Sequence, residues 1–134
     1  MVAFVCTHNS FRSQVAEALG AKLAGDTFAS YSAGTEIAPR INPDAVRLAA
    51  ELFGIDLAAS DQEPKTVFDL PPVDILITMG CGVACPSLPC RYREDWGLDD
   101  PSVAAPEAQA AILRDIEQRV LELRGRIQSG LIPQ

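Results

Sequence analysis

The chain has few basic residues and no long apolar segment. Its 134 residues include 11 Lys and Arg against 18 Asp and Glu, so the formal net charge is −7 and the sequence pI is about 4.5. Without a Lys- and Arg-rich patch to neutralise phosphates, nucleic-acid binding is excluded. No run approaches the roughly 18 to 20 apolar residues that cross a bilayer. The apolar run at residues 2–5 is short and lacks the basic flank of a secretory signal, so we expect no membrane partner and a cytoplasmic protein.

The length suits one domain over residues 1–134 with a single core. Short apolar runs alternate with helical patterns, which predicts a parallel α/β sheet with helices on both faces. Asn42 before Pro43 indicates where the second helix begins, and Gly54 where it ends. The expected strands are residues 1–6, 28–32, 74–79 and 90–93, and the expected helices are 12–23, 43–53 and 107–127.

One segment, Cys6 to Ser13, joins the first expected strand to the first expected helix. A tight loop between a buried strand and a helix N-terminus cradles a tetrahedral oxyanion, because backbone N–H groups and the helix dipole face the ligand. The same surroundings favour a thiolate, which makes Cys6 the predicted nucleophile. Arg12 can bind two oxyanion oxygens through its planar guanidinium, and Ser13 can hydrogen-bond the sulfur. The alternative is an inert, buried Cys6 and a surface Arg12. The expected oxyanion-binding loop is Thr7, His8, Asn9, Ser10, Phe11 and Arg12.

The other three of the four cysteines, Cys81, Cys85 and Cys90, fall within ten residues. This spacing is too uneven for a framework of permanent disulfides and indicates catalytic or metal-binding thiols. Ligands of parallel sheets bind at the carboxyl ends of the strands, so Cys6 and Cys81 are predicted on the same rim. If residues 81–85 form one helical turn, the Cβ atoms of Cys81 and Cys85 lie roughly 5–6 Å apart. A disulfide needs a Cβ–Cβ distance of about 3.5–4.5 Å, so a modest loop movement would bridge them. A redox-active pair fits this spacing.

Two alternatives remain for these thiols. They could bind zinc together with His8, although their spacing differs from a Cys-x2-Cys knuckle, or they could be buried and inert. A general acid is also expected near the cradle, to protonate a leaving oxygen. Asp100, held by Pro101, is the first candidate and Asp99 the second. Solvated turn residues or helix caps are the alternative for both acids.

The motifs Cys6–Glu17 (CTHNSFRSQVAE), Ser32–Thr35, Asn42-Pro43, Cys85-Pro86 and Trp96–Pro101 (WGLDDP) occur in one order along nearly the whole chain. Together they resemble the arsenate reductases built on the low-molecular-weight protein tyrosine phosphatase fold. The resemblance implies a three-layer, flavodoxin-like architecture with four parallel strands. It also implies arsenate reduction, with Cys6 forming a thiol–arsenate adduct that a second cysteine resolves.

The resemblance further implies that a third cysteine moves the disulfide outward, where thioredoxin reduces it. Cys81 is taken as the first resolving thiol and Cys85 as the second, and Cys90 could replace either. Asp100 is implied as the general acid, and phosphate or sulfate as analogues of arsenate. No tightly bound cofactor is expected. A potassium ion at Asn9, Glu17 and Ser32 is a weaker implication.

The chain departs from the family pattern at His8, where glycine is common, at Phe11, and in the spacing of the later cysteines. The main rival is a phosphotyrosine or phosphomonoester phosphatase that uses Cys6, Arg12 and Asp100 alone. Against it, such phosphatases usually carry aromatic residues after the Asp-Pro, where this chain has residues 102–104 as Ser-Val-Ala. A second rival is a non-enzymatic protein whose thiols bind arsenite or a metal. The internal cysteines favour thioredoxin as electron donor, with a low-molecular-weight thiol and glutaredoxin as the alternative. We expect a monomer.

Overall fold

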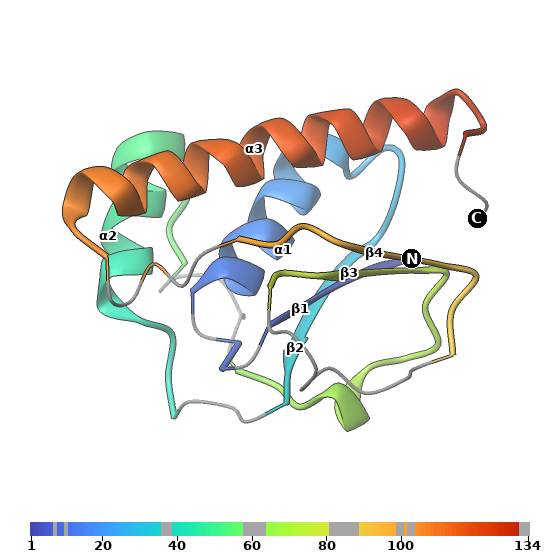
Figure 1. The fold of residues 1–134 in the computed structure, drawn as a ribbon, viewed down its shortest axis with the longest axis horizontal. Coiled ribbons are helices and arrows are strands. Elements are labelled where there is room, and N and C mark those ends of the chain that lie inside the picture. Colours follow the sequence, from blue (N-terminus) through green and yellow to red (C-terminus); the bar gives the residue numbers. More distant parts are fainter. Residues whose placement is uncertain are drawn as a thin grey trace.

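A computed structural model describes residues 1–6, 8–9, 11–35, 39–57, 64–80, 89–98, 101 and 104–131. Strands and helices alternate along the first half of the chain and the longest helix comes last (Figure 1). The elements are β1 (Val2–Cys6), α1 (Arg12–Ala24), β2 (Ser30–Gly34), α2 (Pro43–Phe53), the 3-10 helix η1 (Val67–Asp69), β3 (Ile75–Thr78), β4 (Tyr92–Asp95) and α3 (Pro106–Gln128).

The four strands form one parallel sheet in the order β2-β1-β3-β4. Every residue of β1 and β3 is buried, as expected for near-continuous apolar strands in the middle of a parallel sheet. In β4 half-buried and exposed residues alternate, which is typical of an edge strand. All the predicted helices and strands are present, but β2 and β4 each begin two residues later than expected.

Both shifts have a physical reason. Phe28, which attracted the prediction of β2, packs against Phe4 with ring centroids 6.3 Å apart, just before the strand begins. The strand itself begins at Ser30, whose hydroxyl donates to the carbonyl of Glu17 in α1 at 2.9 Å. Cys90, where β4 was predicted to begin, likewise packs against the core before the strand begins. The strand itself, Tyr92–Asp95, consists of polar residues, which apolar content does not identify.

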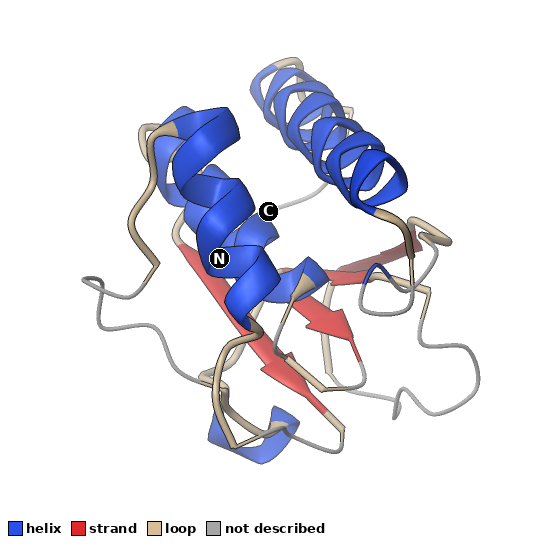
Figure 2. Ribbon diagram, turned by 90° about the vertical axis from the view of Figure 1, so that its left-hand side faces the viewer, coloured by secondary structure: helices blue, strands red, loops and turns tan. Residues whose placement is uncertain are grey.

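Figure 2 shows α1, α2 and α3 together on one face of the sheet. The main hydrophobic cluster lies between these helices and the even-numbered residues of β1. On the opposite face, η1 and its flanking coil cover a smaller cluster, built on Ala3, Val5, Ala33, Val67 and Leu76. The sequence predicted helices on both faces; in the described ranges the three α-helices lie on one face and the 3-10 helix η1 lies on the other. None of the helices described is long and apolar enough to span a membrane.

The edge strand β4 is tied to α3 by one ion pair. Arg126 donates to both carboxylate oxygens of Glu94 at 2.8 Å, and the indole N–H of Trp96 and the hydroxyl of Tyr92 donate to the same carboxylate. Arg126 lowers the pKa of Glu94; burial opposes this, Trp96 and Tyr92 add to it, and the resulting pKa is about 2. This anchor fixes the strand that leads to residues 95–98 at the rim of the sheet.

Candidate active site

The site lies where β1 ends and α1 begins. Cys6 is the last residue of β1 and is 3% exposed. The first turn of α1 contains no acidic residue, and the side chain of Phe11, which precedes it, makes no capping hydrogen bond. In α2, by contrast, the Asn42 side chain accepts a hydrogen bond from Asp44 N at 2.8 Å. Within the described residues, no acidic first-turn residue and no capping side chain neutralises the positive end of α1, which is compatible with anion binding there.

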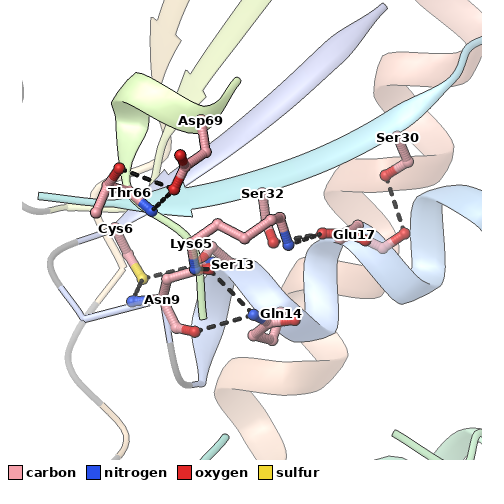
Figure 3. A network of polar contacts seen from close by, with 10 residues as sticks. All are labelled: Cys6, Asn9, Ser13, Gln14, Glu17, Ser30, Ser32, Lys65, Thr66 and Asp69. Atoms are coloured by element: carbon pink, nitrogen blue, oxygen red, sulfur yellow. Dashed lines mark hydrogen bonds and ion pairs between the residues drawn. The ribbon is translucent and has the colours of Figure 1, made fainter. Parts of the chain in front are cut away.

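Among the described residues, Ser13 and Asn9 contact the sulfur of Cys6 (Figure 3). The Ser13 hydroxyl lies 2.9 Å from Sγ, and the backbone N–H of Asn9 donates to Sγ at 3.2 Å. The side-chain amide of Asn9 donates to Ser13 Oγ at 2.8 Å. The Ser13 oxygen can accept from Asn9 while its own proton points to the sulfur, so Ser13 and the Asn9 N–H can both serve as hydrogen-bond donors to a Cys6 thiolate.

Asn9 is fully buried and holds the loop in an unusual conformation. Its φ of +51° is in the left-handed region, which asparagine tolerates better than most residues. Its side-chain oxygen accepts from Gln14 Nε2 at 3.1 Å and from the backbone N–H of Lys65 at 2.7 Å, and its carbonyl accepts from Gln14 at 3.0 Å. The loop that presents Cys6 is therefore fixed from α1 and from the coil before η1.

Arg12 is 7% exposed and is held by two backbone carbonyls. Its Nη1 donates to Met79 O at 2.7 Å and to Leu98 O at 2.9 Å. Both bonds use one nitrogen, so within the described residues Nε and Nη2 remain for a ligand. Carbonyls rather than a carboxylate hold the guanidinium, so its positive charge is not neutralised by these partners. This is the arrangement that a bidentate grip on an oxyanion requires.

Glu17 lies at the centre of a second group of contacts, behind the loop. Its carboxylate accepts from the Ser32 hydroxyl and lies 3.5 Å from the Lys65 ammonium (Figure 3). Lys65 also donates its backbone N–H to Asn9, and its carbonyl accepts from Gly34 N at 2.7 Å. Lys65 was not predicted as a site residue, because nothing in its local sequence signals contacts with Asn9 and Glu17, which lie 56 and 48 positions earlier in the chain.

Of the remaining predicted residues, the structure describes His8, Phe11 and Cys90. His8 is exposed beside the loop, and the Phe11 side chain is buried in the core, so Phe11 can offer a ligand only its main chain. Cys90 is a free, half-buried thiol on the face opposite to Cys6. Thr7, Ser10, Cys81, Cys85, Asp99 and Asp100 lie outside the described residues.

The described neighbours of these residues nevertheless reach the site. Cys81 follows Gly80 and Asp99 follows Leu98 in the chain, and Arg12 binds the carbonyls of Met79 and Leu98. Within the described ranges no three His, Cys, Asp or Glu side chains are grouped so that they could hold a metal ion. His8 and Cys90 lie at opposite ends of the sheet, which argues against a zinc site that uses both.

Comparison with known proteins agrees with this geometry. Residues 1–130 match the family model described as low molecular weight phosphotyrosine protein phosphatase. An arsenate reductase of Halalkalibacterium halodurans is 39% identical over 128 residues, covering 90% of this chain and 88% of that protein. A glutaredoxin arsenate reductase of Synechocystis is 33% identical over 129 residues, covering 94% of this chain and 97% of that protein.

Two solved structures are also similar. An arsenate reductase in its phosphate-binding state superposes with a TM-score of 0.81 at 33% identity, covering 94% of this chain and 97% of that one. A thioredoxin-dependent arsenate reductase of Corynebacterium glutamicum gives a TM-score of 0.76 at 34% identity, covering 96% of this chain and 62% of that one. The chain therefore belongs to the low molecular weight phosphotyrosine protein phosphatase family, in the group that contains the arsenate reductases.

Proposed function

We propose that this protein reduces arsenate to arsenite, with Cys6 as nucleophile and its own later cysteines as electron carriers. The observation that carries the proposal is the pairing of a hydrogen-bonded Cys6 sulfur with the Arg12 guanidinium at the uncapped N-terminus of α1. The similarity to arsenate reductases over about nine tenths of the chain supports arsenate as the substrate.

In the first step the Cys6 thiolate attacks arsenic, and an S–As bond forms while one As–O bond breaks. Arg12 and the first N–H groups of α1 hold the remaining oxygens. The departing oxygen takes a proton, for which Asp100 is the proposed donor. Arsenic stays in the +5 state, so this step needs no electron donor. Ser13 and Asn9 stabilise the thiolate before the attack.

In the second step a resolving thiolate attacks Cys6 Sγ. A disulfide forms, the S–As bond breaks and its electron pair stays on arsenic, which leaves as arsenite in the +3 state. A third thiolate then attacks the resolving sulfur, which frees Cys6 and moves the disulfide. An external dithiol protein finally reduces that disulfide and becomes oxidised itself. Cys81 is proposed as the first resolving thiol and Cys85 as the second.

The strand register supports this choice over Cys90. Tyr92 pairs with Ile75 and Ile75 with Val2, so Arg91 lies level with Met1 and Cys90 lies one residue before that level. Cys6 therefore lies six residues further along the strand direction, which at about 3.3 Å per residue is roughly 20 Å away along the sheet. Cys90 also packs on the opposite face, whereas a disulfide needs Cα atoms within about 7 Å.

A dithiol protein is proposed as the reductant, since one similar protein is described as thioredoxin-dependent and another as a glutaredoxin arsenate reductase. Thioredoxin is the finer proposal, because a chain with its own relay can present a disulfide directly. Such thiol chemistry needs a reducing compartment, so we also propose a cytoplasmic location. We further propose that residues 1–134 form a single domain and that the protein is a monomer.

The contacts of Asn9 and Glu17 argue against a potassium ion at Asn9, Glu17 and Ser32. The Asn9 oxygen already accepts from Gln14 and Lys65, and the Glu17 carboxylate accepts from Ser32 and faces the Lys65 ammonium. Asn9 Oδ1 and Glu17 Oε1 are therefore already engaged, and Lys65 supplies a positive charge next to Glu17, where a potassium ion would repel it. No step of the proposed reaction depends on potassium.

The cradle also fits phosphate esters, and a similar structure is described in a phosphate-binding state. Phosphomonoester hydrolysis, using Cys6, Arg12 and Asp100 alone, is therefore the second candidate activity. It would leave the later cysteines without a role.

The deciding experiment is arsenate-dependent NADPH consumption with thioredoxin and thioredoxin reductase supplied. We expect steady turnover that requires both proteins and is abolished in Cys6→Ser. Turnover that instead needs glutathione and glutaredoxin would keep the reductase and change the donor. If neither system supports turnover while p-nitrophenyl phosphate is hydrolysed, the arsenate proposal is wrong and the hydrolase is correct.

A further inference from the structure

Asp95 ends β4 at the surface and has no part in the chemistry proposed above. Its carboxylate oxygen Oδ1 nevertheless accepts two hydrogen bonds, from Thr78 Oγ1 at 2.8 Å and from the backbone N–H of Gly80 at 3.0 Å. Thr78 ends β3, and Gly80 is the residue directly before Cys81. One oxygen of Asp95 therefore connects the ends of two neighbouring strands to the start of the cysteine segment, residues 81–90.

Gly80 is confined from its other side by Leu98. Its φ of +88° is a conformation that glycine adopts without a steric penalty. A Cβ on Gly80 would lie 2.5 Å from the carbonyl oxygen of Leu98 and 2.9 Å from its nitrogen. The two backbones thus meet directly, and the only side chain that donates to or accepts from Gly80 among the described contacts is that of Asp95.

Arg12 joins this contact to the oxyanion cradle. Its Nη1 donates to Met79 O, one residue before Gly80, and to Leu98 O. We name the group Arg12, Met79, Gly80, Asp95 and Leu98 the rim junction. The rim junction links the Arg12 guanidinium to Gly80, which precedes Cys81, and to Leu98, which precedes Asp99.

The pKa of Asp95 agrees with a carboxylate used as an acceptor. Partial burial raises its pKa, but the hydrogen bonds from Thr78, Gly80 and Gly97 outweigh burial and bring the pKa below its ordinary value. Asp95 is therefore ionised, and its hydrogen bonds are charge-assisted.

We propose that Asp95 is a positioning residue for the thiol relay, which holds Gly80 so that the cysteine segment starts in a fixed direction from the Cys6 cradle. This inference rests on the proposed arsenate reduction. The first step uses only groups of the cradle. The second requires a thiolate of the cysteine segment to attack Cys6 Sγ in line with the S–As bond, so that the S–S bond forms as the electron pair moves to arsenic. If Gly80 can adopt many directions, that alignment is reached less often.

The test compares Asp95→Ala with Asp95→Asn, which keeps an oxygen acceptor, and with Asp74→Ala. The control removes a carboxylate that accepts from the N-terminal ammonium at 2.8 Å, at the opposite end of β3. In Asp95→Ala we expect thioredoxin-coupled arsenate turnover to fall about five- to tenfold, the effect of losing the charge-assisted hydrogen bond from Gly80 near the surface. Asp74→Ala should stay within about twofold of the unchanged protein, and Asp95→Asn, which keeps an acceptor without the charge, should lie between Asp74→Ala and Asp95→Ala.

Peptide-resolved alkylation of Cys6, and its protection by inorganic phosphate, reports on the cradle alone. Both should change less than about twofold in Asp95→Ala. Equal losses in turnover and in phosphate protection would show a general structural role and overturn the proposal, as would unchanged turnover.

If the unchanged protein reduces no arsenate, the proposed function fails first, and hydrogen exchange then tests Asp95 on its own. Faster amide exchange at Gly80 and the residues after it, in Asp95→Ala but not in Asp74→Ala, supports positioning. Unchanged exchange there overturns it.

Discussion

Replacing Glu94 by Gln should destabilise the fold in a way that depends on pH. The carboxylate accepts two hydrogen bonds from Arg126, and its pKa is about 2 against an ordinary 4.5. That difference corresponds to roughly 3 kcal/mol of folding free energy, which we reduce to about 2 kcal/mol because the pair is partly in contact with solvent. A folded-state pKa below the unfolded one stabilises the protein above pH 4.5, and the contribution is lost as the pH falls from about 4.5 toward 2.

Urea denaturation at pH 7, 5.5, 4.5 and 3.5 measures this directly. The unchanged protein should exceed Glu94→Gln by about 2 kcal/mol at pH 7, and the gap should narrow steadily below pH 4.5. The matched control is Asp115→Asn, which breaks the exposed pair with Arg119 and should cost less than about 1 kcal/mol at every pH. A gap for Glu94→Gln that stays constant from pH 7 to pH 3.5 would refute the reasoning, because the loss would then come from packing and not from ionisation.

Three further substitutions test the site. Ser13→Ala should slow alkylation of Cys6 at pH 7 and lower arsenate turnover about tenfold, because a hydrogen-bond donor to the thiolate is lost; an unchanged alkylation rate would show that the hydroxyl does not donate to the sulfur. Gly80→Ala should lower stability by about 1–3 kcal/mol in urea denaturation, since its Cβ would collide with Leu98 O; full stability would mean that the backbones move apart easily. Cys90→Ser should leave single-turnover arsenite release, measured by rapid quench, within about twofold, and a complete loss would show that Cys90 resolves the adduct.

Local sequence patterns predicted most of the fold because the core follows simple periodicity. The continuous Ile75-Leu76-Ile77 run reads as a strand covered on both faces, and it lies next to β1 in the middle of the sheet. Asn42 and Gly54 mark the ends of α2 by cap chemistry that depends only on neighbouring residues. Such signals are local, so a single sequence contains them in full.

The starts of β2 and β4 were predicted two residues too early, because both strands depend on contacts with residues far away in the sequence. Ser30 and the other small polar residues of β2 lie against α1, where Gly20 allows close approach: a Cβ on Gly20 would lie 2.7 Å from Ser30 Oγ. Apolar content alone does not identify such a strand. In β4 the polar residues are stabilised by a partner on α3, Arg126, which is 32 positions from Glu94 in the chain. Both strands are determined by tertiary contacts.

The residues of the candidate site also include some that local sequence predicts and some that only tertiary contacts reveal. Cys6, Arg12 and Ser13 were predicted because nucleophile, guanidinium and hydroxyl share one loop and one helical turn. Asn9, which holds Ser13, was also predicted. Lys65, Met79 and Leu98 were not, since they hold Asn9 and Arg12 through backbone atoms, which every residue type carries. A carbonyl that holds Arg12 leaves no trace in residue identity at positions 79 and 98.

The cradle alone can bind a tetrahedral oxyanion, so phosphate and arsenate are not separated there by the groups that were predicted from sequence. For the arsenate adduct, reduction requires that a second thiol reach Cys6 before water attacks arsenic. In our proposal the contacts that favour the thiol are those of Gly80 with Leu98 and with the Asp95 carboxylate. Changes at this junction should therefore alter the partition between reduction and hydrolysis more than changes to the oxyanion loop itself.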